Sequence, residues 1–443
     1  MATRMFAPSC RADNDGSTNE PSWSAILAAV ALALAFVLLT RWPVARTQPM
    51  ESDEFGFLQD IAGRWFPMHH TLFKTLARGI GLIGNDAYRG FIVLDMIASA
   101  LAMVSVWWWL RALVRPSVAA AAALLLGVGP VFWGYGAIAG NYTAIVVVGS
   151  FLLGVAIRGH RRPEAWQPLA AATLLAVGTG YRPDIGVLWL PVFLVILWQH
   201  RWRRAVLAGI AFAALNLAWA VPMIVDAGGW ENYRAASARF AHETGARNSY
   251  WHLGLVDGPM RYSVKLAMAL LWTLGPALLF VPRGGLRLWR LESGHFLALL
   301  LVLSIVPALA FHLLIHFGVP GYCFHYLPSV MALVVLGIGH DHGLASVPAN
   351  GSRPSPGDRA TPRLIGLAAI LAGVFWFYPT DFSAPGWRGD FDLAFCRLTR
   401  KGLNTPAPRP GPRLWRTANS TKPTELPNHD RSPSGFLTAE TRE

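Results

Sequence analysis

The stretch WSAILAAVALALAFVLLTRW occupies residues 23–42 and is an almost unbroken apolar block between two tryptophans. In a helix that rises about 1.5 Å per residue, this block spans about 28 Å, close to the thickness of the hydrocarbon core of a bilayer. Tryptophan is enriched at both membrane interfaces, so Trp23 and Trp42 fit the two ends of a spanning helix. A long polar segment precedes the block, which favours an uncleaved first helix over a removed signal peptide.

The whole chain has the composition of a membrane protein. Of its 443 residues, 53% are hydrophobic and only 14% are charged, too little charge for a soluble domain of this size. The net charge of +13 comes largely from arginines in short clusters between apolar blocks, and no nucleic-acid-binding motif accompanies them. We therefore predict an all-α, polytopic integral membrane protein. Its cysteines have neither metal-ligand spacing nor a disulfide pattern; they are Cys10, Cys323 and Cys396.

Ten further apolar blocks bring the predicted number of transmembrane helices to about eleven. Two of them are separated only by YRPD and form either two short helices or one broken helix. We see no internal repeat. The further blocks are 90–110, 117–133, 137–157, 167–180, 184–199, 205–225, 263–281, 296–316, 322–339 and 363–379.

The arginine clusters predict the orientation of the spans. They fall in alternate loops, and the positive-inside rule places those loops and a disordered N-terminus, residues 1–22, in the cytoplasm. Basic loops flank 167–199 on both sides, which favours two spans there. The transmembrane domain covers 23–380, and a largely disordered tail, 381–443, follows it outside the cytoplasm. We expect the bacterial plasma membrane and a place in the cell envelope.

Two longer loops then lie on the extracytoplasmic side, 43–89 and 226–262. In the first, FGFLQDIAGRWF and TLFKTLARGIGLIG have apolar residues at helical spacing and are too short to span, so we predict two amphipathic helices in the membrane interface. The second mixes aromatic and arginine side chains, which suit either sugar binding or an interfacial aromatic belt.

The first loop opens with PMESDEFGFLQD, which begins at Pro49 and holds the densest acidic cluster of the sequence. One interpretation is a solvated loop. Another is that Asp53 and Glu54, fixed at the interface, take a proton from an incoming hydroxyl or hold a divalent metal. His69 and His70 are adjacent and would point to different faces of a helix, which argues against a shared ion. We expect no metal and no other cofactor.

The order of these motifs resembles the GT-C membrane glycosyltransferases, especially the protein O-mannosyltransferases and the lipid A aminoarabinose transferases. Their first loop has Asp-Glu, a helix, a His-Pro-Pro-Leu-like turn and a second helix. Asp53-Glu54 matches, and HHTLF (residues 69–73) stands at the turn without its prolines. GTGYRPDIGVLWLPVF resembles two short central helices joined by a basic residue, here Arg182. GYCFHYLPSVMAL resembles an Arg-Tyr-x-x-x-Pro pattern, with His325 at the arginine position. The resemblance covers roughly residues 20–340.

This resemblance implies transfer of a sugar from a polyprenyl phosphate to an extracytoplasmic lipid, glycan or protein, with inversion at the anomeric carbon. It makes Asp53 the base, with Glu54 orienting the acceptor or a neighbouring helix. No role follows for Glu51 or Asp60. The remaining predicted site residues are Arg182 and His325 for the donor phosphate, and His69, His70, Tyr322 and Tyr326 for substrate.

Other interpretations stay open. The chain could be a transporter or flippase, or a GT-C-like protein without catalysis. Asp95 is the ionic residue well inside a span, with Lys265 nearer an end, and an arginine across the bundle could pair with it. Arg182 could merely extend to the interface, and His325 could be a hydrogen-bonded core histidine. The sequence does not identify the sugar or the acceptor.

Overall fold

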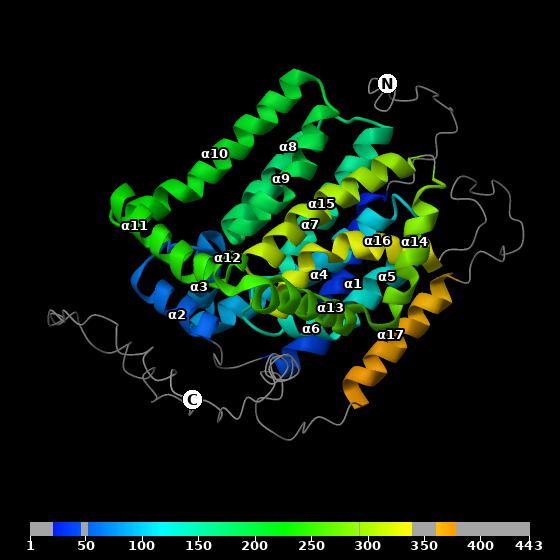
Figure 1. Ribbon diagram of the computed structural model, residues 1–443, viewed down its shortest axis with the longest axis horizontal. Helices are drawn as coiled ribbons and strands as arrows, with labels where there is room; N and C mark the ends of the chain where they lie inside the picture. The colour runs from blue at the N-terminus through cyan, green and yellow to red at the C-terminus, as the bar shows by residue number, and fades with distance from the viewer. Residues whose placement is uncertain (1–20, 46–51, 292, 339–359, 378–443) are drawn as a thin grey trace, which may run out of the picture. The chain divides into compact units, whose positions relative to one another are not determined.

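The computed structural model describes residues 21–45, 52–291, 293–338 and 360–377, and within these ranges the secondary structure is helical, without strands (Figure 1). Contacts divide the chain into two units, Met1–Thr399 and Arg400–Glu443, and all described residues belong to the first. The predicted disordered tail, 381–443, and nearly all of the predicted N-terminal segment lie outside the described residues.

The described chain is an all-α membrane protein, as the sequence predicts. Each of the eleven apolar blocks contains a helix. Six helical segments are long and apolar enough to cross a bilayer, and several shorter apolar helices accompany them. The long segments are α1 (Trp23–Arg41), α4 (Ala87–Leu110), α7 (Thr143–Arg161), α10 (Trp202–Asp226), the run Tyr250–Leu288 and α15 (Gly294–Leu314).

The shorter apolar helices fill the remaining predicted blocks. The block at 263–281 is broken: α13 (Arg261–Leu274) is followed by a 3₁₀ segment and then by α14 (Val281–Leu288). The block at 137–157 begins with a turn rather than a helix, because α7 starts only at Thr143. The others are α5 (Pro116–Val128), α6 (Pro130–Tyr135), α8 (Gln167–Tyr181), α9 (Pro183–Trp198), α16 (Leu327–Ile338) and α17 (Ala360–Phe377).

Helix α4 lies at the centre of the bundle and packs against α1, α3, α5 and α7. It begins at Asp86, whose carboxylate caps the helix by accepting from the Arg89 amide at 3.1 Å. Most of its length is buried. By contrast, α10 contacts mainly α8, and most of its surface is exposed. Helix α4 is therefore the element around which the polar groups at one end of the bundle can be fixed.

Helices α8 and α9 are two separate helices that pack on each other, as the basic loops on both sides predict. Arg182 joins them with extended backbone dihedrals, φ −155° and ψ 111°. A residue before proline is pushed out of the helical region, and proline is tolerated at the first position of a helix. Pro183 therefore ends α8 and starts α9, and it leaves Arg182 at the turn.

The first loop contains two helices, as predicted: α2 (Ser52–Gly63) and α3 (Thr71–Gly84). Helix α3 packs directly on the start of α4, where glycine allows the two backbones to touch. A Cβ added at Gly90 would lie 2.0 Å from the carbonyl oxygen of Ala77, and one added at Gly81 would lie 2.7 Å from the Cα of Ala87. The first loop is thus docked on the bundle by backbone contact.

Replacing Gly90 by alanine should destabilise the protein, because the new methyl group must separate α3 from α4. We expect a loss of about 1–3 kcal/mol, the usual cost of overpacking, measured as a lower thermal unfolding midpoint in detergent. Gly79→Ala on exposed α3 surface is the control: no atom lies within 4 Å of its added Cβ, and the higher helix propensity of alanine stabilises it slightly. Equal midpoints for the two variants would contradict the docking described here.

Candidate active site

A short turn, residues 139–142, lies between α6 and α7 and receives side chains from several helices. Asp95 on α4 accepts hydrogen bonds at Oδ2 from the amides of Gly140 (2.9 Å) and Asn141 (3.1 Å). Glu54 on α2 accepts at Oε1 from the amide of Ala139 at 3.2 Å. The sequence predicts a helix that begins at residue 137. The structure has a turn there instead, and the backbone amides of this turn point toward the two carboxyl groups.

Glu54 is almost completely buried, with 2% of its surface exposed, although it lies in a loop helix. Its Oε1 also accepts from the hydroxyl of Tyr88 in the first turn of α4, at 2.7 Å. Glu54 therefore joins α2 to both α4 and the 139–142 turn. Asp53, the predicted base, precedes it in the first turn of α2, and the Asp53 side chain lies outside the described part of the chain.

Arg182 lies at the same end of the bundle and is only 4% exposed. Its Nε donates to both carboxylate oxygens of Asp184, at 2.9 and 3.0 Å, and its Nη1 donates to Oδ1 of Asn141 at 2.6 Å. The guanidinium lies over the rings of Tyr142, at 3.8 Å, and Tyr322, at 5.0 Å. Arg182 is therefore a fixed cation, not a side chain extended into solvent.

Two of the other predicted residues gather around the same ion pair. Tyr322 faces the guanidinium, as just described. His325, at the end of a 3₁₀ segment (Pro320–His325), is fully buried, and its Nε2 lies 3.3 Å from Oδ2 of Asp184. Tyr326 is one step removed, because its hydroxyl is bonded to Nδ1 of His312 on α15 at 2.8 Å. The donor and substrate roles of these residues stay predictions.

Asn141, Tyr142 and Asp184 were missed as site residues. Asp184 is part of the YRPD stretch, and an aspartate two residues after an arginine is a recognisable signal for a local ion pair. Asn141 and Tyr142 carried none, since they stand at the start of a block that reads as a helix. Their role depends on contacts with residues more than 40 positions away along the chain.

His69 and His70 form the turn before α3, and both have left-handed backbone dihedrals, with φ 54° and 53°. His69 stacks on Phe240 of α11 (Trp230–Phe240) at 4.1 Å between ring centres, whereas His70 meets Phe57 of α2 edge-on at 5.8 Å. They point apart, as the sequence predicts, but from a turn and not a helix. Proline is restricted to φ near −65°, so a proline at position 70 could not form this turn.

Both imidazoles are held neutral by their surroundings. Burial, followed by the charges of Arg182 and Lys74, lowers the pKa of His70 well below its usual value. Burial and then Lys74 lower the pKa of His69, while Asp60 opposes that change. A neutral imidazole in this turn can donate and accept hydrogen bonds.

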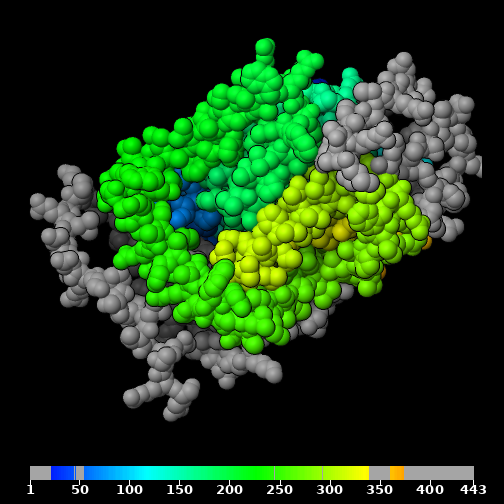
Figure 2. Space-filling view, turned by 45° about the horizontal axis from the view of Figure 1, so that its top comes forward, coloured from blue at the N-terminus to red at the C-terminus, as the bar shows by residue number. Residues whose placement is uncertain are grey.

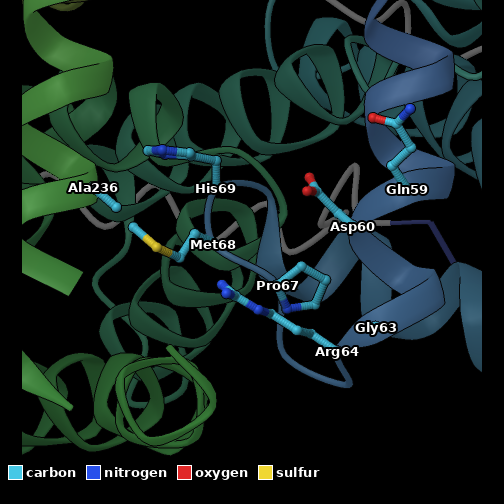
Figure 3. A pocket seen from close by; sticks show the side chains of 8 residues that line it. All are labelled: Gln59, Asp60, Gly63, Arg64, Pro67, Met68, His69 and Ala236. Carbon is cyan, nitrogen blue, oxygen red and sulfur yellow. The ribbon is translucent and has the colours of Figure 1, made fainter. Parts of the chain in front are cut away.

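A cavity of about 380 Å³ lies beside this turn (Figure 3). Asp60 lines it and forms an ion pair with the buried Lys74, whose Nζ also donates to the carbonyl oxygen of Met68 at 2.9 Å. At the other end of the turn, the Phe66 amide donates to Oδ2 of Asp226, the last residue of α10, at 2.7 Å. The residues that line the cavity are Gln59, Asp60, Gly63, Arg64, Pro67, Met68, His69 and Ala236.

The surface above this region is hollowed. Figure 2 shows a hollow between the green helices α10 and α11 and the rest of the bundle, with blue atoms of the α2–α3 region at its floor. Within the described ranges, no group of three or more histidine, cysteine or acidic side chains lies close enough together to hold a metal ion.

The fold and the site define an integral membrane protein with a buried cation and buried carboxylates at one end of an apolar helical bundle. Residues 69–225, about a third of the chain, match the sequence profile of the dolichyl-phosphate-mannose-protein mannosyltransferase family. The match includes Asp95, Asn141 and Arg182; Asp53 and Glu54 precede it and His325 follows it. No curated protein matches the chain significantly. The match confirms the resemblance and supports a membrane glycosyltransferase of the mannosyltransferase type.

The lowered pKa of His70 predicts a pH-dependent stability. Below the ordinary histidine pKa of about 6.5, the unfolded chain binds a proton at His70 that the folded chain does not bind. The contribution of His70 to the free energy of unfolding is therefore fully present above this pH and is lost as the pH falls. We expect the unfolding midpoint of the wild type to fall between pH 7.5 and 5.5, and His70→Asn to reduce that fall. Asparagine tolerates the left-handed backbone.

The control is His242→Asn, because His242 is exposed. An unchanged pH dependence in His70→Asn, or the same reduction in the control, would contradict this assignment.

Proposed function

We propose that this protein transfers a sugar from a polyprenyl-phosphate donor to an acceptor outside the cytoplasm, with inversion of the anomeric configuration. The observation that carries the proposal is the geometry of Arg182. The leaving group is an anionic phosphate attached to a lipid, and it needs a cation at the level of the membrane interface. A guanidinium with a fixed plane suits phosphate, because its paired N–H groups match two phosphate oxygens.

The surroundings of Arg182 support a single bound phosphate. Asp184 holds the Nε edge of the guanidinium, and the neutral His70 nearby adds no second cation. The two tyrosine rings and Asn141 fix the plane of the guanidinium before a ligand arrives, which reduces the ordering cost of binding. We assign the phosphate of the donor to this cation, and we assign His325 to the support of Asp184.

In the proposed reaction, Asp53 acts as the base. An ordinary aspartate has a pKa of about 3.9 and is ionised at neutral pH. The acceptor hydroxyl attacks the anomeric carbon, and the bond from that carbon to the phosphate oxygen breaks. The electron pair leaves with the lipid phosphate, and the hydroxyl proton passes to Asp53. Glu54 is already engaged by Tyr88 and Ala139, so its part is to fix α2.

We place the acceptor in the cavity next to His69. The cavity lies along α2, the helix that also carries Asp53, and Asp60 follows Asp53 by seven residues or about 10 Å of helix. Its lining combines carboxylate, amide, guanidinium and imidazole groups with Met68 and Pro67. Such a lining suits a hydroxyl-bearing polar group with some apolar surface.

Replacing Asp53 by asparagine should reduce sugar transfer from a polyprenyl-phosphate donor by about 10²–10⁴-fold, the usual contribution of a positioned base. Expression and thermal stability should stay at the wild-type level. Glu51→Gln makes the same change of charge two residues earlier and should transfer normally. Wild-type transfer by Asp53→Asn would remove Asp53 from the mechanism.

The acceptor cavity can be filled from the opposite wall. Ala236→Phe, on α11, should raise the acceptor KM about tenfold or more while it leaves the donor KM unchanged, because the new ring occupies the cavity and Arg182 does not line it. Its neighbour Ala235 is exposed and does not line the cavity, so Ala235→Phe is the matched control. Equal acceptor KM values for both variants would place the acceptor elsewhere.

A further inference from the structure

We infer that Asp95 and Asn141 are positioning residues for the cation that binds the lipid phosphate: Asp95 fixes the 139–142 turn, and Asn141 then fixes Arg182. This inference rests on the proposed function, because it gives Arg182 a phosphate to bind. It concerns residues inside the bundle that the sequence motifs do not assign.

First, the buried carboxyl group of Asp95 accepts hydrogen bonds from the 139–142 turn and from Thr143. The carboxylate is completely buried in α4, where an isolated charge would be very costly. Two backbone amides of the turn and the hydroxyl of Thr143, at 3.4 Å from Oδ1, donate to it. These donors belong to one short segment, so the carboxyl group of Asp95 keeps its hydrogen bonds only when that segment has its observed shape.

The second step is the conformation of Asn141. Its φ of 49° is left-handed, a region that few residues other than glycine occupy. The bond from its amide to Asp95 holds it there. Its side chain then presents Oδ1 to Nη1 of Arg182 at 2.6 Å, and the following ring, Tyr142, lies against the guanidinium. The turn thus contacts the guanidinium of Arg182 twice: Asn141 accepts a hydrogen bond at its edge, and the ring of Tyr142 lies against its face.

The third step connects the cation to the proposed base. Glu54, next to Asp53 on α2, binds the amide of Ala139, two residues before Asn141. The helix of the base and the cation for the leaving group are therefore both attached to one turn. Displacement at a carbon needs the base and the leaving group at a fixed separation, and this turn sets that separation.

A buried arginine at the end of α1 completes the support. Arg41 is fully buried. Its Nη2 donates to the carbonyl oxygen of Gly127 at 3.3 Å. A Cβ at Gly136 would lie 1.8 Å from its Nη1, so a glycine is needed for this approach. Arg41 therefore lies against the segment that leads into the 139–142 turn.

The test measures binding of undecaprenyl phosphate to the full chain in detergent, together with transfer from a polyprenyl-phosphate sugar. Asn141→Gly keeps a left-handed backbone and removes only the acceptor for Arg182. Asp95→Leu keeps the size of the side chain and removes the oxygen to which both backbone amides donate. Each should weaken lipid-phosphate binding about tenfold, the range lost with one charge-assisted hydrogen bond.

The decisive comparison repeats both changes in an Arg182→Ala background. If they act through Arg182, neither weakens binding further there. The control is Ser99→Ala, one turn after Asp95 on α4, which should bind normally. Effects of the same size in both backgrounds, or no binding by the wild type, would overturn the inference. Coupled binding without any sugar transfer by the wild type would overturn the proposed function alone.

Discussion

The structure of this site depends on one constraint: a carboxyl group buried in an apolar bundle needs hydrogen-bond donors. Asp95 meets it with the backbone amides of Gly140 and Asn141, and Glu54 does the same with Ala139 and Tyr88. The donors of a turn are free for this purpose because the turn is not a helix. The same constraint therefore explains why the chain is non-helical at this point and why polar side chains from separate helices meet there.

The constraint also bears on the alternative of a transporter. A mid-span aspartate is a common sign of an ion pathway, and Asp95 is such a residue. In this protein its carboxyl group accepts hydrogen bonds from the 139–142 turn and holds that turn in place. These contacts explain a buried aspartate in α4 by a structural role. The presence of Asp95 is therefore weak evidence for a transporter.

Most of the fold could be predicted from the sequence. The length of an apolar block reflects the thickness of the hydrocarbon core, and the placement of arginines reflects the side of the membrane on which a loop lies. Two features followed from simple patterns: the two helices of the first loop from helical spacing, and the separation of α8 and α9 from the basic loops on both sides of them. The site was only partly predictable. Arg182 stood out as a basic residue in a tight turn, but Asn141 depends on contacts across the bundle and leaves no local signal. The broken α13–α14 segment was missed for a related reason, because its apolar composition continues through the break.

One contact connects this chemistry to the lipid around it. Helix α10 has many exposed residues, and its last residue, Asp226, accepts a hydrogen bond from the Phe66 amide of the turn that borders the cavity. A long helix with little protein contact adjusts its tilt to the thickness of the bilayer. When α10 tilts, the acceptor for Phe66 moves with it, and the turn follows or loses the bond. We therefore expect the width of the cavity to respond to membrane thickness.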